Sequence, residues 1–227
     1  MKPQLACFER LGSAGWRALE QVVAVAHEAG LLVLADGKRG DVPHTAGVYA
    51  EALFETLGAD AATANPLLGG DALEPLVAAA ERQGAGVFAL VRTSNPGAAD
   101  LLDLETADPN NPAASQRPLH EQLARMVAER APRLAGEGGL SGMGAVVGAT
   151  EPRHFARLRE LMPSSIFLVP GIGAQGGDAA DLGPAFAGTP ASVLVPASRS
   201  IAGAADPAAA AAALRDQVWA ASQSAAR

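Results

Sequence analysis

The chain has 227 residues, of which 49% are hydrophobic, 18% charged and 4% aromatic, so it can bury a sizeable core and is not dominated by disorder. Because aromatic residues are scarce and 25 residues are glycine, the composition argues against an all-β sandwich and favours helices packed closely on a parallel sheet. A formal net charge of −7 argues against nucleic acid or an anionic membrane surface as the main partner, since neither attracts an acidic protein.

Short apolar runs alternate along the chain with longer amphipathic or alanine-rich segments. The runs predict seven strands, near residues 3–8, 31–36, 60–65, 86–91, 144–149, 166–170 and 192–196. Seven helices are predicted to follow them, at about 15–29, 45–57, 71–83, 119–134, 152–161, 178–187 and 207–221. Seven successive βα units predict a parallel sheet with right-handed crossovers, either an open doubly wound sheet or a (β/α)-barrel, in a single domain over residues 1–227.

The segment 93–117 interrupts this alternation. It contains Asn95-Pro96-Gly97 and Pro109-Asn110-Asn111-Pro112, and it is too polar to belong to the core. We expect a long structureless loop after the fourth predicted strand. Such a loop is either a tolerated surface insertion or a lid over a site at the carboxyl ends of the strands.

Cys7 is the single cysteine of the chain, so an intrachain disulfide is excluded. The sequence also has no Cys/His cluster of the kind that holds a structural zinc, and this thiol usage fits a reducing cytoplasm. It contains no run of about 18 uninterrupted apolar residues, the length that a transmembrane helix needs. We therefore expect a soluble cytoplasmic protein.

The densest polar cluster follows the second predicted strand. Asp36 and Lys38 are two residues apart, so an extended backbone points both side chains to one face, where they form an ion pair at the catalytic end of a barrel. Asp41 then begins a loop, and Thr45 lies near the start of the next helix, where its hydroxyl caps the helix or meets an anion. A solvated salt bridge with a helix cap is the purely structural interpretation, but four polar groups at this spacing favour a site.

Two carboxylates flank Lys38 in the sequence, and nearby negative charge keeps a lysine in its ammonium form. An ammonium suits proton donation better than Schiff-base chemistry, which needs a neutral amine. Lys2, at the start of the first predicted strand, is a second cation that can close the same charge network.

A glycine-rich run, residues 170–178, follows the sixth predicted strand, and Ser198-Arg199 follows the seventh. Backbone amides in such a turn together with an arginine fork suit a phosphate monoester, and the last two loops of a (β/α)-barrel often form such a site. Gly171, Gly173 and Gly176 also spell G-x-G-x-x-G, but a dinucleotide-binding turn belongs after an early strand. The third interpretation is that these glycines serve tight turns only.

On these motifs the chain resembles the orotidine 5′-phosphate decarboxylase family, and within it the bacterial subgroup with a longer loop after the fifth barrel strand. The similarity extends over essentially the whole chain. It rests on Lys2-Pro3-Gln4, Asp36-x-Lys38-x-x-Asp41 with Thr45, Asn65-Pro66-Leu67-Leu68-Gly69-Gly70-Asp71, Thr93-Ser94-Asn95-Pro96, Val146-Val147-Gly148-Ala149-Thr150, Pro170-Gly171-Ile172-Gly173-Ala174-Gln175-Gly176-Gly177 and Ser198-Arg199. Sugar-phosphate decarboxylases of the same superfamily share the Asp-x-Lys-x-x-Asp motif, so the loop motifs carry the distinction.

The resemblance implies a (β/α)8 TIM barrel that decarboxylates orotidine 5′-monophosphate to uridine 5′-monophosphate, the last step of de novo pyrimidine synthesis, without a metal or an organic cofactor. It makes Lys38 the proton donor to C6 of the pyrimidine, with a charge that stabilises the developing carbanion. Asp36 is expected to lie against the substrate carboxylate while it holds Lys38. Lys2 is expected to join this network and to touch the ribose.

The resemblance also assigns the residues that hold the rest of the substrate: Thr93 and Ser94 at the pyrimidine edge, Gln175 and Arg199 at the phosphate, and the backbones of Gly173 and Ser198 beside it. Asp41 and Thr45 match residues that reach into the neighbouring subunit's site. A homodimer is therefore implied.

Three features depart from the family pattern, the mildest being Val42 in place of a more usual isoleucine. The first family strand, which carries a Leu-Asp whose carboxylate binds ribose hydroxyls, has no counterpart before Lys2. Seven βα units cannot close an eight-stranded barrel, so we expect Met1 to be an internal start, with roughly 30–50 further residues upstream. His44 replaces a small or polar residue, and we expect an exposed loop histidine there.

Two other functions stay open. One is a related decarboxylase or aldolase acting on a sugar phosphate, which needs metal ligands, typically an extra Glu beside the Asp motif. The other is a non-catalytic protein that binds nucleotide phosphate and has lost activity with the first strand. Activity that depends on a metal would indicate the sugar-phosphate enzyme, and product binding without turnover would indicate the non-catalytic protein.

Overall fold

Six strands form the principal sheet. They are β1 (Leu34–Arg39), β2 (Ala61–Ala64), β3 (Gly86–Arg92), β6 (Ser141–Val147), β7 (Ser165–Leu168) and β8 (Val193–Leu194), hydrogen-bonded in this order. The pairs β1–β2, β2–β3 and β7–β8 are parallel. A doubly wound sheet reverses its strand order at a switch point, whereas this order follows the chain throughout. The α/β fold is therefore that of a (β/α) TIM barrel, and the doubly wound alternative is wrong.

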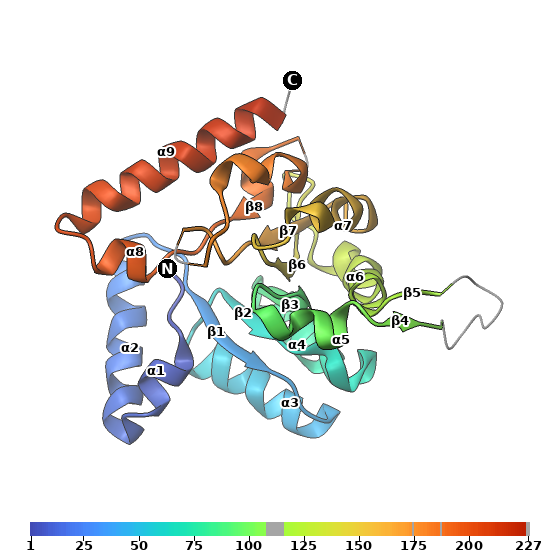
Figure 1. Cartoon of the computed structure of the whole chain (residues 1–227). Helices are drawn as coiled ribbons and strands as arrows, with labels where there is room; N and C mark the ends of the chain where they lie inside the picture. Colours follow the sequence, from blue (N-terminus) through green and yellow to red (C-terminus); the bar gives the residue numbers. More distant parts are fainter. Residues whose placement is uncertain (108–115, 174, 187, 226–227) are drawn as a thin grey trace. The chain divides into compact units, whose positions relative to one another are not determined.

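The computed structural model describes residues 1–107, 116–173, 175–186 and 188–225 (Figure 1). The chain divides into two units. The first unit comprises Met1–Leu90 and Arg130–Gly144, and the second comprises Val91–Glu129 and Ala145–Arg227. Strands β3 and β6 begin in the first unit and end in the second.

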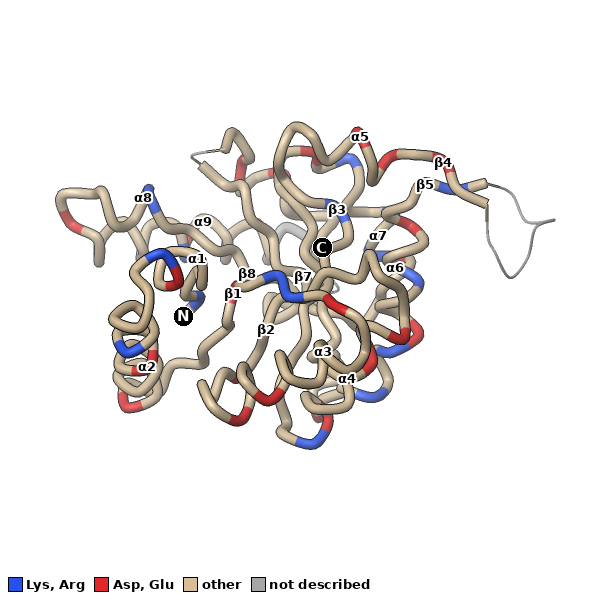
Figure 2. Tube along the Cα trace, turned by 90° about the horizontal axis from the view of Figure 1, so that it is seen from below, with Lys and Arg blue, Asp and Glu red and all other residues tan. Residues whose placement is uncertain are grey.

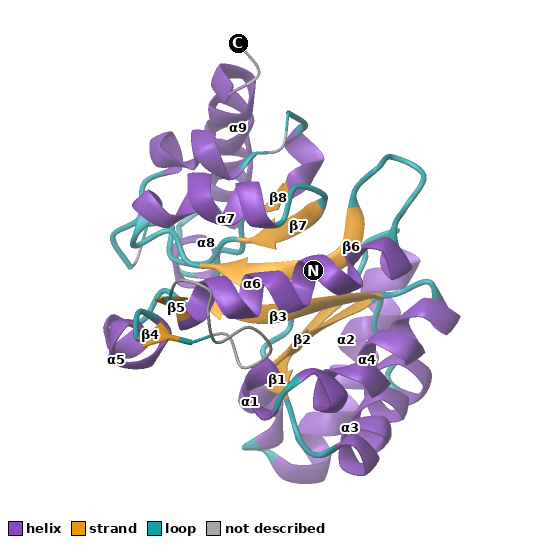
Figure 3. Ribbon diagram, turned by 90° about the vertical axis from the view of Figure 1, so that its right-hand side faces the viewer, coloured by secondary structure: helices purple, strands orange, loops and turns teal. Residues whose placement is uncertain are grey.

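Apart from α1 (Leu5–Glu9), which replaces a predicted strand, the helices of the first unit lie close to their predicted positions. The others are α2 (Gly12–Glu28), α3 (Pro43–Ala50), which continues as a π-helical turn over Glu51–Thr56, and α4 (Gly70–Gln83). Helices α3 and α4 pack against each other beside strands β1 to β3 (Figure 3). Strand β2, with the sequence Ala-Ala-Thr-Ala, is buried from Ala62 to Ala64. Such small side chains allow helices to pack closely on the sheet.

The second unit has several short helices and one long helix at its end. They are α5 (Ala99–Leu102), α6 (Leu119–Arg130), α7 (Phe155–Leu161), α8 (Arg199–Ala202) and α9 (Pro207–Ala225). The predicted helix 178–187 is a 3-10 helix over Ala179–Ala185, because Gly183 and Pro184 lie inside it and disfavour an α-helix. Helix α9 packs against this 3-10 helix, so the alanine-rich tail is a packed helix as expected.

The predicted strand at 3–8 is wrong. The carbonyls of Met1 and Pro3 accept hydrogen bonds from the amides of Leu34 and Asp36, but the chain turns into α1 at Leu5. The segment Leu-Ala-Cys-Phe-Glu has no β-branched residue and three good helix formers, so the local preference for helix prevails once the chain leaves β1. Only the first four residues therefore run along the sheet.

The prediction that 93–117 is structureless is wrong for part of its length. This segment contains a 3-10 turn at Pro96–Ala98, helix α5, and the antiparallel pair β4 (Glu105–Thr106) and β5 (Arg117–Pro118). Residues 108–115, with the Pro109-Asn110-Asn111-Pro112 run, lie outside the described residues. Polarity alone misled the prediction, because short helices and hairpins at a surface need no apolar run.

Other strand boundaries shift by a few residues. Strand β1 begins at Leu34 and not near residue 31, because Leu31 and Leu32 are exposed and contribute nothing to the core. Strand β6 begins at Ser141, earlier than predicted. Within the described residues no helix has both the length and the apolar composition to cross a membrane.

Arg159 in α7 ties the end of its helix to the neighbouring segments of the second unit. Its guanidinium donates to the carbonyls of Ala185 at 2.7 and 2.9 Å, Met162 at 2.9 Å and Ser165 at 2.7 Å, and it lies 3.7 Å from the centre of the Phe167 ring. Burial lowers the pKa of Arg159 to about 10, so it stays a cation at neutral pH.

We expect Arg159→Met to lower the free energy of unfolding by about 3 kcal/mol, because buried carbonyls lose their donors. Urea denaturation measures the change. Arg153→Met is the control, since Arg153 is 69% exposed and pairs with Glu151 on the surface, and we expect it to change stability by less than about 0.5 kcal/mol. Equal losses in the two variants would contradict the role given to Arg159.

Candidate active site

A buried carboxylate between two lysines is the centre of the candidate site in the first unit. Asp36 is 5% exposed, and its Oδ1 lies 2.6 Å from Nζ of Lys38, while its Oδ2 pairs with Nζ of Lys2. The hydroxyl of Thr63 in β2 donates to Oδ1 of Asp36 at 2.9 Å. We call these four residues the lysine–aspartate cluster. The predicted association of Lys2, Asp36 and Lys38 is therefore present in the structure.

An irregularity in β1 places Lys38. The register of β1 against β2 shifts between Ala35 and Arg39, and Lys38 adopts a φ of 49°. A left-handed conformation costs a residue with a side chain about 1–3 kcal/mol and persists only where its surroundings hold it. Here the amide of Lys38 donates to Oγ1 of Thr63 at 2.8 Å. The bulge therefore turns the lysine back to Asp36, a task that a plain extended strand was predicted to perform.

The charge state of Asp36 follows from this arrangement. Burial raises the pKa of Asp36, but the hydrogen bonds from Lys2 and Lys38 and their positive charges outweigh it, so the net pKa is lowered below the ordinary 3.8. At neutral pH the cluster therefore contains one carboxylate and two cations that contact it.

The lowered pKa predicts a specific dependence of stability on pH. An acid whose pKa is lowered by folding stabilises the fold above its unfolded pKa, and this contribution is lost as the pH falls through the lowered value. We expect Asp36→Asn to be less stable than the unsubstituted protein at pH 7. The difference should shrink below a pH of about 4, where the carboxyl of Asp36 is protonated in the unfolded chain, and vanish at the lower pH where it is protonated in the folded protein too. Urea denaturation at both pH values measures it, and a difference that stays constant down to pH 3 would contradict the assignment.

Asp41 and Thr45 follow the cluster without joining it. The carboxylate of Asp41 accepts a hydrogen bond from the amide of Val42 at 2.7 Å, and among the described residues it forms no ion pair with Lys38. The N-cap of α3 is Val42 and no side chain caps it, so Thr45 does not cap this helix. His44 is exposed as expected, but in the first turn of α3 and not in a loop. Figure 2 shows the basic positions at the end of β1 and the acidic position that comes soon after it.

In the second unit, Thr93 and Ser94 follow β3. The hydroxyl of Ser94 donates to Oε1 of Gln175 at 2.7 Å, and its carbonyl accepts from Oγ1 of Thr150 at 3.0 Å. A Cβ on Gly148 would lie 2.6 Å from Cα of Ser94, so only glycine allows the chain after β6 to approach this closely. The structure thus joins the predicted pyrimidine-edge residue Ser94 to the predicted phosphate-binding residue Gln175.

The glycine-rich turn uses many of its own amides. The amides of Gly173, Gly176 and Gly177 donate to carbonyls within the turn, at 3.0, 2.8 and 2.9 Å. The sequence predicted amides that meet a phosphate; in this structure these three amides are engaged within the turn, and phosphate binding by the turn stays a prediction. The tight-turn interpretation therefore accounts for much of the motif, with Gly171 at a φ of 113°. Residue 174 lies outside the described residues.

Ser198 and Arg199 mark the start of α8. The carbonyl of Ser198 accepts from the amides of Ile201 and Ala202, at 3.1 and 2.8 Å. The side chain of Arg199 is exposed, and over the ranges that the structure describes it makes no hydrogen bond or ion pair. Its guanidinium is therefore available to a ligand.

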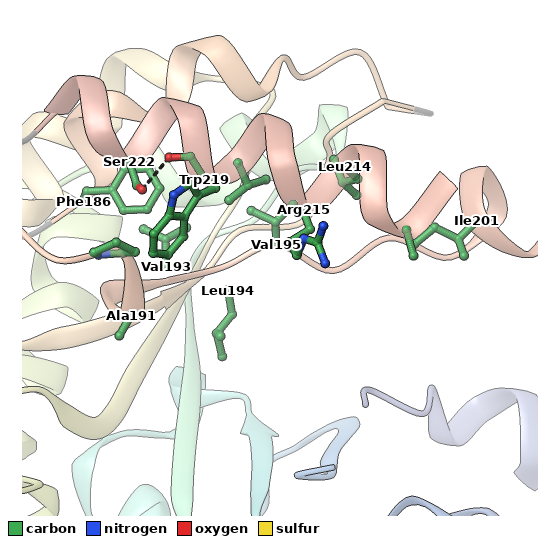
Figure 4. A pocket seen from close by; sticks show the side chains of 13 residues that line it. Phe186, Ala191, Val193, Leu194, Val195, Ile201, Leu214, Arg215, Trp219 and Ser222 are labelled. Carbon is green, nitrogen blue, oxygen red and sulfur yellow. Dashed lines mark hydrogen bonds between the residues drawn. The ribbon is translucent and has the colours of Figure 1, made fainter. Parts of the chain in front are cut away.

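The second unit also has a cavity of about 510 Å³ between β8 and α9 (Figure 4). Its lining is almost wholly apolar, with Arg215 as its charged member and Ser222 hydrogen-bonded to the carbonyl of Trp219 at 2.7 Å. None of the predicted site residues lines it. We assign no part of a charged substrate to this cavity. As for metals, no group of three or more His, Cys, Asp or Glu side chains within the described ranges is placed to hold one.

Sequence reasoning missed Thr63, the hydroxyl that joins Asp36 to the backbone of Lys38. A threonine in a strand is ordinarily explained by its β-branched shape, so its type alone gave no signal. The useful signal was its position: it is the one polar residue of β2, next to the strand that carries Asp36.

Comparison with known proteins gives a consistent result. The family model described as "Orotidine 5'-phosphate decarboxylase / HUMPS family" matches residues 1–214. The chain is 42% identical over 208 residues to the orotidine 5'-phosphate decarboxylase of Rhodopirellula baltica, and 46% identical over 177 residues to that of a Roseiflexus species. These matches cover 88% and 78% of the chain, but only 66% and 58% of the relatives' length.

Solved structures agree. The OMP decarboxylase of Leishmania donovani has a TM-score of 0.78 at 38% identity, over 97% of this chain and 80% of that one. The UMP synthase of the same organism has a TM-score of 0.81 at 40% identity, over 97% of this chain and 46% of that one. The likeness therefore extends over nearly all of the chain in both sequence and fold.

Proposed function

The chain belongs to the orotidine 5′-phosphate decarboxylase / HUMPS family, and from this premise we propose that it converts orotidine 5′-monophosphate to uridine 5′-monophosphate without a metal or an organic cofactor. The observation that carries the proposal is the lysine–aspartate cluster. A buried carboxylate held between two ammonium groups is costly to build for stability alone, since an apolar set of similar volume often serves the fold as well. Its presence at the carboxyl-terminal half of β1 favours a catalytic role.

The reaction needs one bond to break and one to form. The bond from C6 of the pyrimidine to the carboxylate breaks, carbon dioxide leaves, and the electron pair stays on C6. Nζ of Lys38 donates the proton to C6, and its positive charge stabilises the carbanion as it develops. Asp36 holds Lys38 in place and lies against the departing carboxylate, and Lys2 keeps Asp36 ionised.

The remaining roles rest on matches to family motifs. Thr93 and Ser94 contact the pyrimidine edge, and Lys2 also touches the ribose. Gln175 and Arg199 bind the phosphate, with the backbones of Gly173 and Ser198 beside it. Support for this part comes from the free guanidinium of Arg199 and the Ser94–Gln175 hydrogen bond. Binding energy from the remote phosphate then serves to orient the ring for the chemical step.

The enzyme acts as a homodimer in which Asp41 and Thr45 serve the neighbouring subunit's site. The support is that Asp41, although it follows the motif closely, forms no ion pair with Lys38 of its own chain among the described residues. We further propose a cytoplasmic location and a role in de novo pyrimidine synthesis. The single cysteine and the family membership support these two statements.

Subunit complementation tests the dimer. Lys38→Ala and Asp41→Ala proteins are each expected to be nearly inactive. Because a mixed dimer contains one site with both native residues, dissociating and reassociating a mixture should restore part of the turnover. Sedimentation equilibrium gives the oligomeric state in parallel. A dimer whose mixtures recover no activity, or an active monomer, would contradict the sharing of Asp41.

The decisive assay incubates the purified chain with orotidine 5′-monophosphate and a chelator, and follows the ultraviolet absorbance of the pyrimidine. Loss of substrate and formation of uridine 5′-monophosphate are expected without added metal. Turnover that requires a divalent cation would point to the related sugar-phosphate enzymes. Tight binding of uridine 5′-monophosphate with no turnover would point to a non-catalytic nucleotide-binding protein.

A further inference from the structure

A buried arginine ends β3, directly before Thr93 and Ser94. Arg92 is only 4% exposed, and the apolar residue before it in the strand, Val91, is fully buried. The charged side chain of Arg92 is therefore buried at the end of this strand. Its guanidinium binds Asp103 with both carboxylate oxygens, from Nε to Oδ1 at 2.8 Å and from the second amino group to Oδ2 at 3.0 Å. A two-bond pair of this kind fixes direction as well as distance.

The same guanidinium reaches the candidate site. Its remaining amino group donates to the carbonyl of Thr93 at 2.9 Å, and the carbonyl of Arg92 accepts from the amide of Gly148 at 2.7 Å. Hydrogen bonds therefore hold the carbonyls of two successive residues, Arg92 and Thr93. Ser94 follows, with its own carbonyl bound to Thr150.

Asp103 in turn has support from the far side. It follows α5, and Nδ1 of the buried His120 lies 3.2 Å from its Oδ1 and 2.8 Å from the carbonyl of Leu102. The hydrogen bonds from Arg92 are the main cause that lowers the pKa of Asp103, so it is a carboxylate at neutral pH. The pair thus connects the residue that follows α5 to the last residue of β3.

We propose that Arg92 and Asp103 are positioning residues, which hold the backbone of Thr93 and Ser94 in the conformation that the substrate needs. This inference rests on the proposed function, in which Thr93 and Ser94 contact the pyrimidine. The pair is costly as a purely structural feature, because Arg92 is buried, Asp103 is only 25% exposed, and such a pair is often no better for stability than apolar groups of the same size. What an apolar pair cannot do is donate to the Thr93 carbonyl. Neither residue touches the reacting atoms.

The test separates positioning from stability. Arg92→Met leaves the partly exposed Asp103 without its guanidinium, and Asp103→Asn leaves the buried Arg92 without a carboxylate, so both single variants should lose stability and turnover. The double variant removes both charges, and its thermal midpoint should recover toward that of the unsubstituted protein. The donor to Thr93 is still missing, so kcat is expected to stay about 10- to 100-fold low. Affinity for uridine 5′-monophosphate should fall, while affinity for ribose 5-phosphate, which lacks the ring, should not change.

A matched control is the pair Arg157–Glu121, which makes the same two-bond contact, at 3.0 and 2.9 Å, elsewhere in the second unit. The double variant Arg157→Met/Glu121→Gln should keep kcat and nucleotide affinity. If turnover and nucleotide affinity recover together with stability in the Arg92→Met/Asp103→Asn protein, the pair is structural and the inference is wrong. If the unsubstituted protein neither turns over orotidine 5′-monophosphate nor binds uridine 5′-monophosphate, the proposed function fails, and this inference fails with it.

Discussion

Replacement of Lys38 by alanine is expected to abolish turnover of orotidine 5′-monophosphate while leaving binding of uridine 5′-monophosphate largely intact. The variant removes the ammonium whose Nζ lies 2.6 Å from Oδ1 of Asp36. Loss of a general acid alone lowers a rate by about 10²- to 10⁴-fold, and loss of the positive charge at the carbanion adds to this. Asp36 keeps Lys2 and Thr63 as partners, so the buried carboxylate is not left alone and the fold should persist.

Kinetics and calorimetric titration with the product measure the two quantities separately. Arg82→Ala is the control, because it removes an exposed cation from the last turn of α4, outside the lysine–aspartate cluster. This variant should leave kcat unchanged. Turnover within a few fold of normal in the Lys38→Ala protein would refute the proton-donor assignment. Loss of product binding together with turnover would show instead that the cluster was disrupted.

The sequence allowed much of the sheet to be predicted, because buried parallel strands are continuous apolar runs. Strand β3 was expected at 86–91 and occupies Gly86–Arg92, and the order of strands follows from the alternation of strands and helices. The failure at residues 3–8 has a clear cause. A run of six residues carries too little pattern to separate a strand from a helix, and pairing with β1 reaches only to Gln4.

The cluster was predictable in its members but not in its geometry. The two-residue spacing correctly predicted that Asp36 and Lys38 make contact. The contact, however, depends on a bulge in which Lys38 has a φ of 49° and is stabilised by Thr63 from another strand. No local pattern encodes a bond between residues that are 25 positions apart. The same holds for Arg92 and Asp103, which pair only because the segment after β3 folds into α5 and returns to the strand.

Replacement of Arg199 by alanine is expected to act on binding and much less on the chemical step. Its guanidinium is exposed and, in the described part of the chain, makes no bond to the protein, so its removal costs the fold little. Hydrogen bonds to charged groups contribute about 1.5–3 kcal/mol, so losing the contact to a phosphate should raise KM by about 10- to 100-fold. Steady-state kinetics with orotidine 5′-monophosphate give the change in KM and in kcat.

The nucleoside orotidine, which has no phosphate, identifies the cause. If Arg199 binds the phosphate, the variant and the unsubstituted protein should turn over orotidine equally slowly, so that the effect of the substitution disappears with the phosphate. Arg215→Ala is the matched control, because Arg215 is an exposed arginine of the same unit that pairs with its neighbour Asp216 and lies at the apolar cavity. An unchanged KM in the Arg199→Ala protein, or an equal loss of activity toward orotidine, would contradict phosphate binding by Arg199.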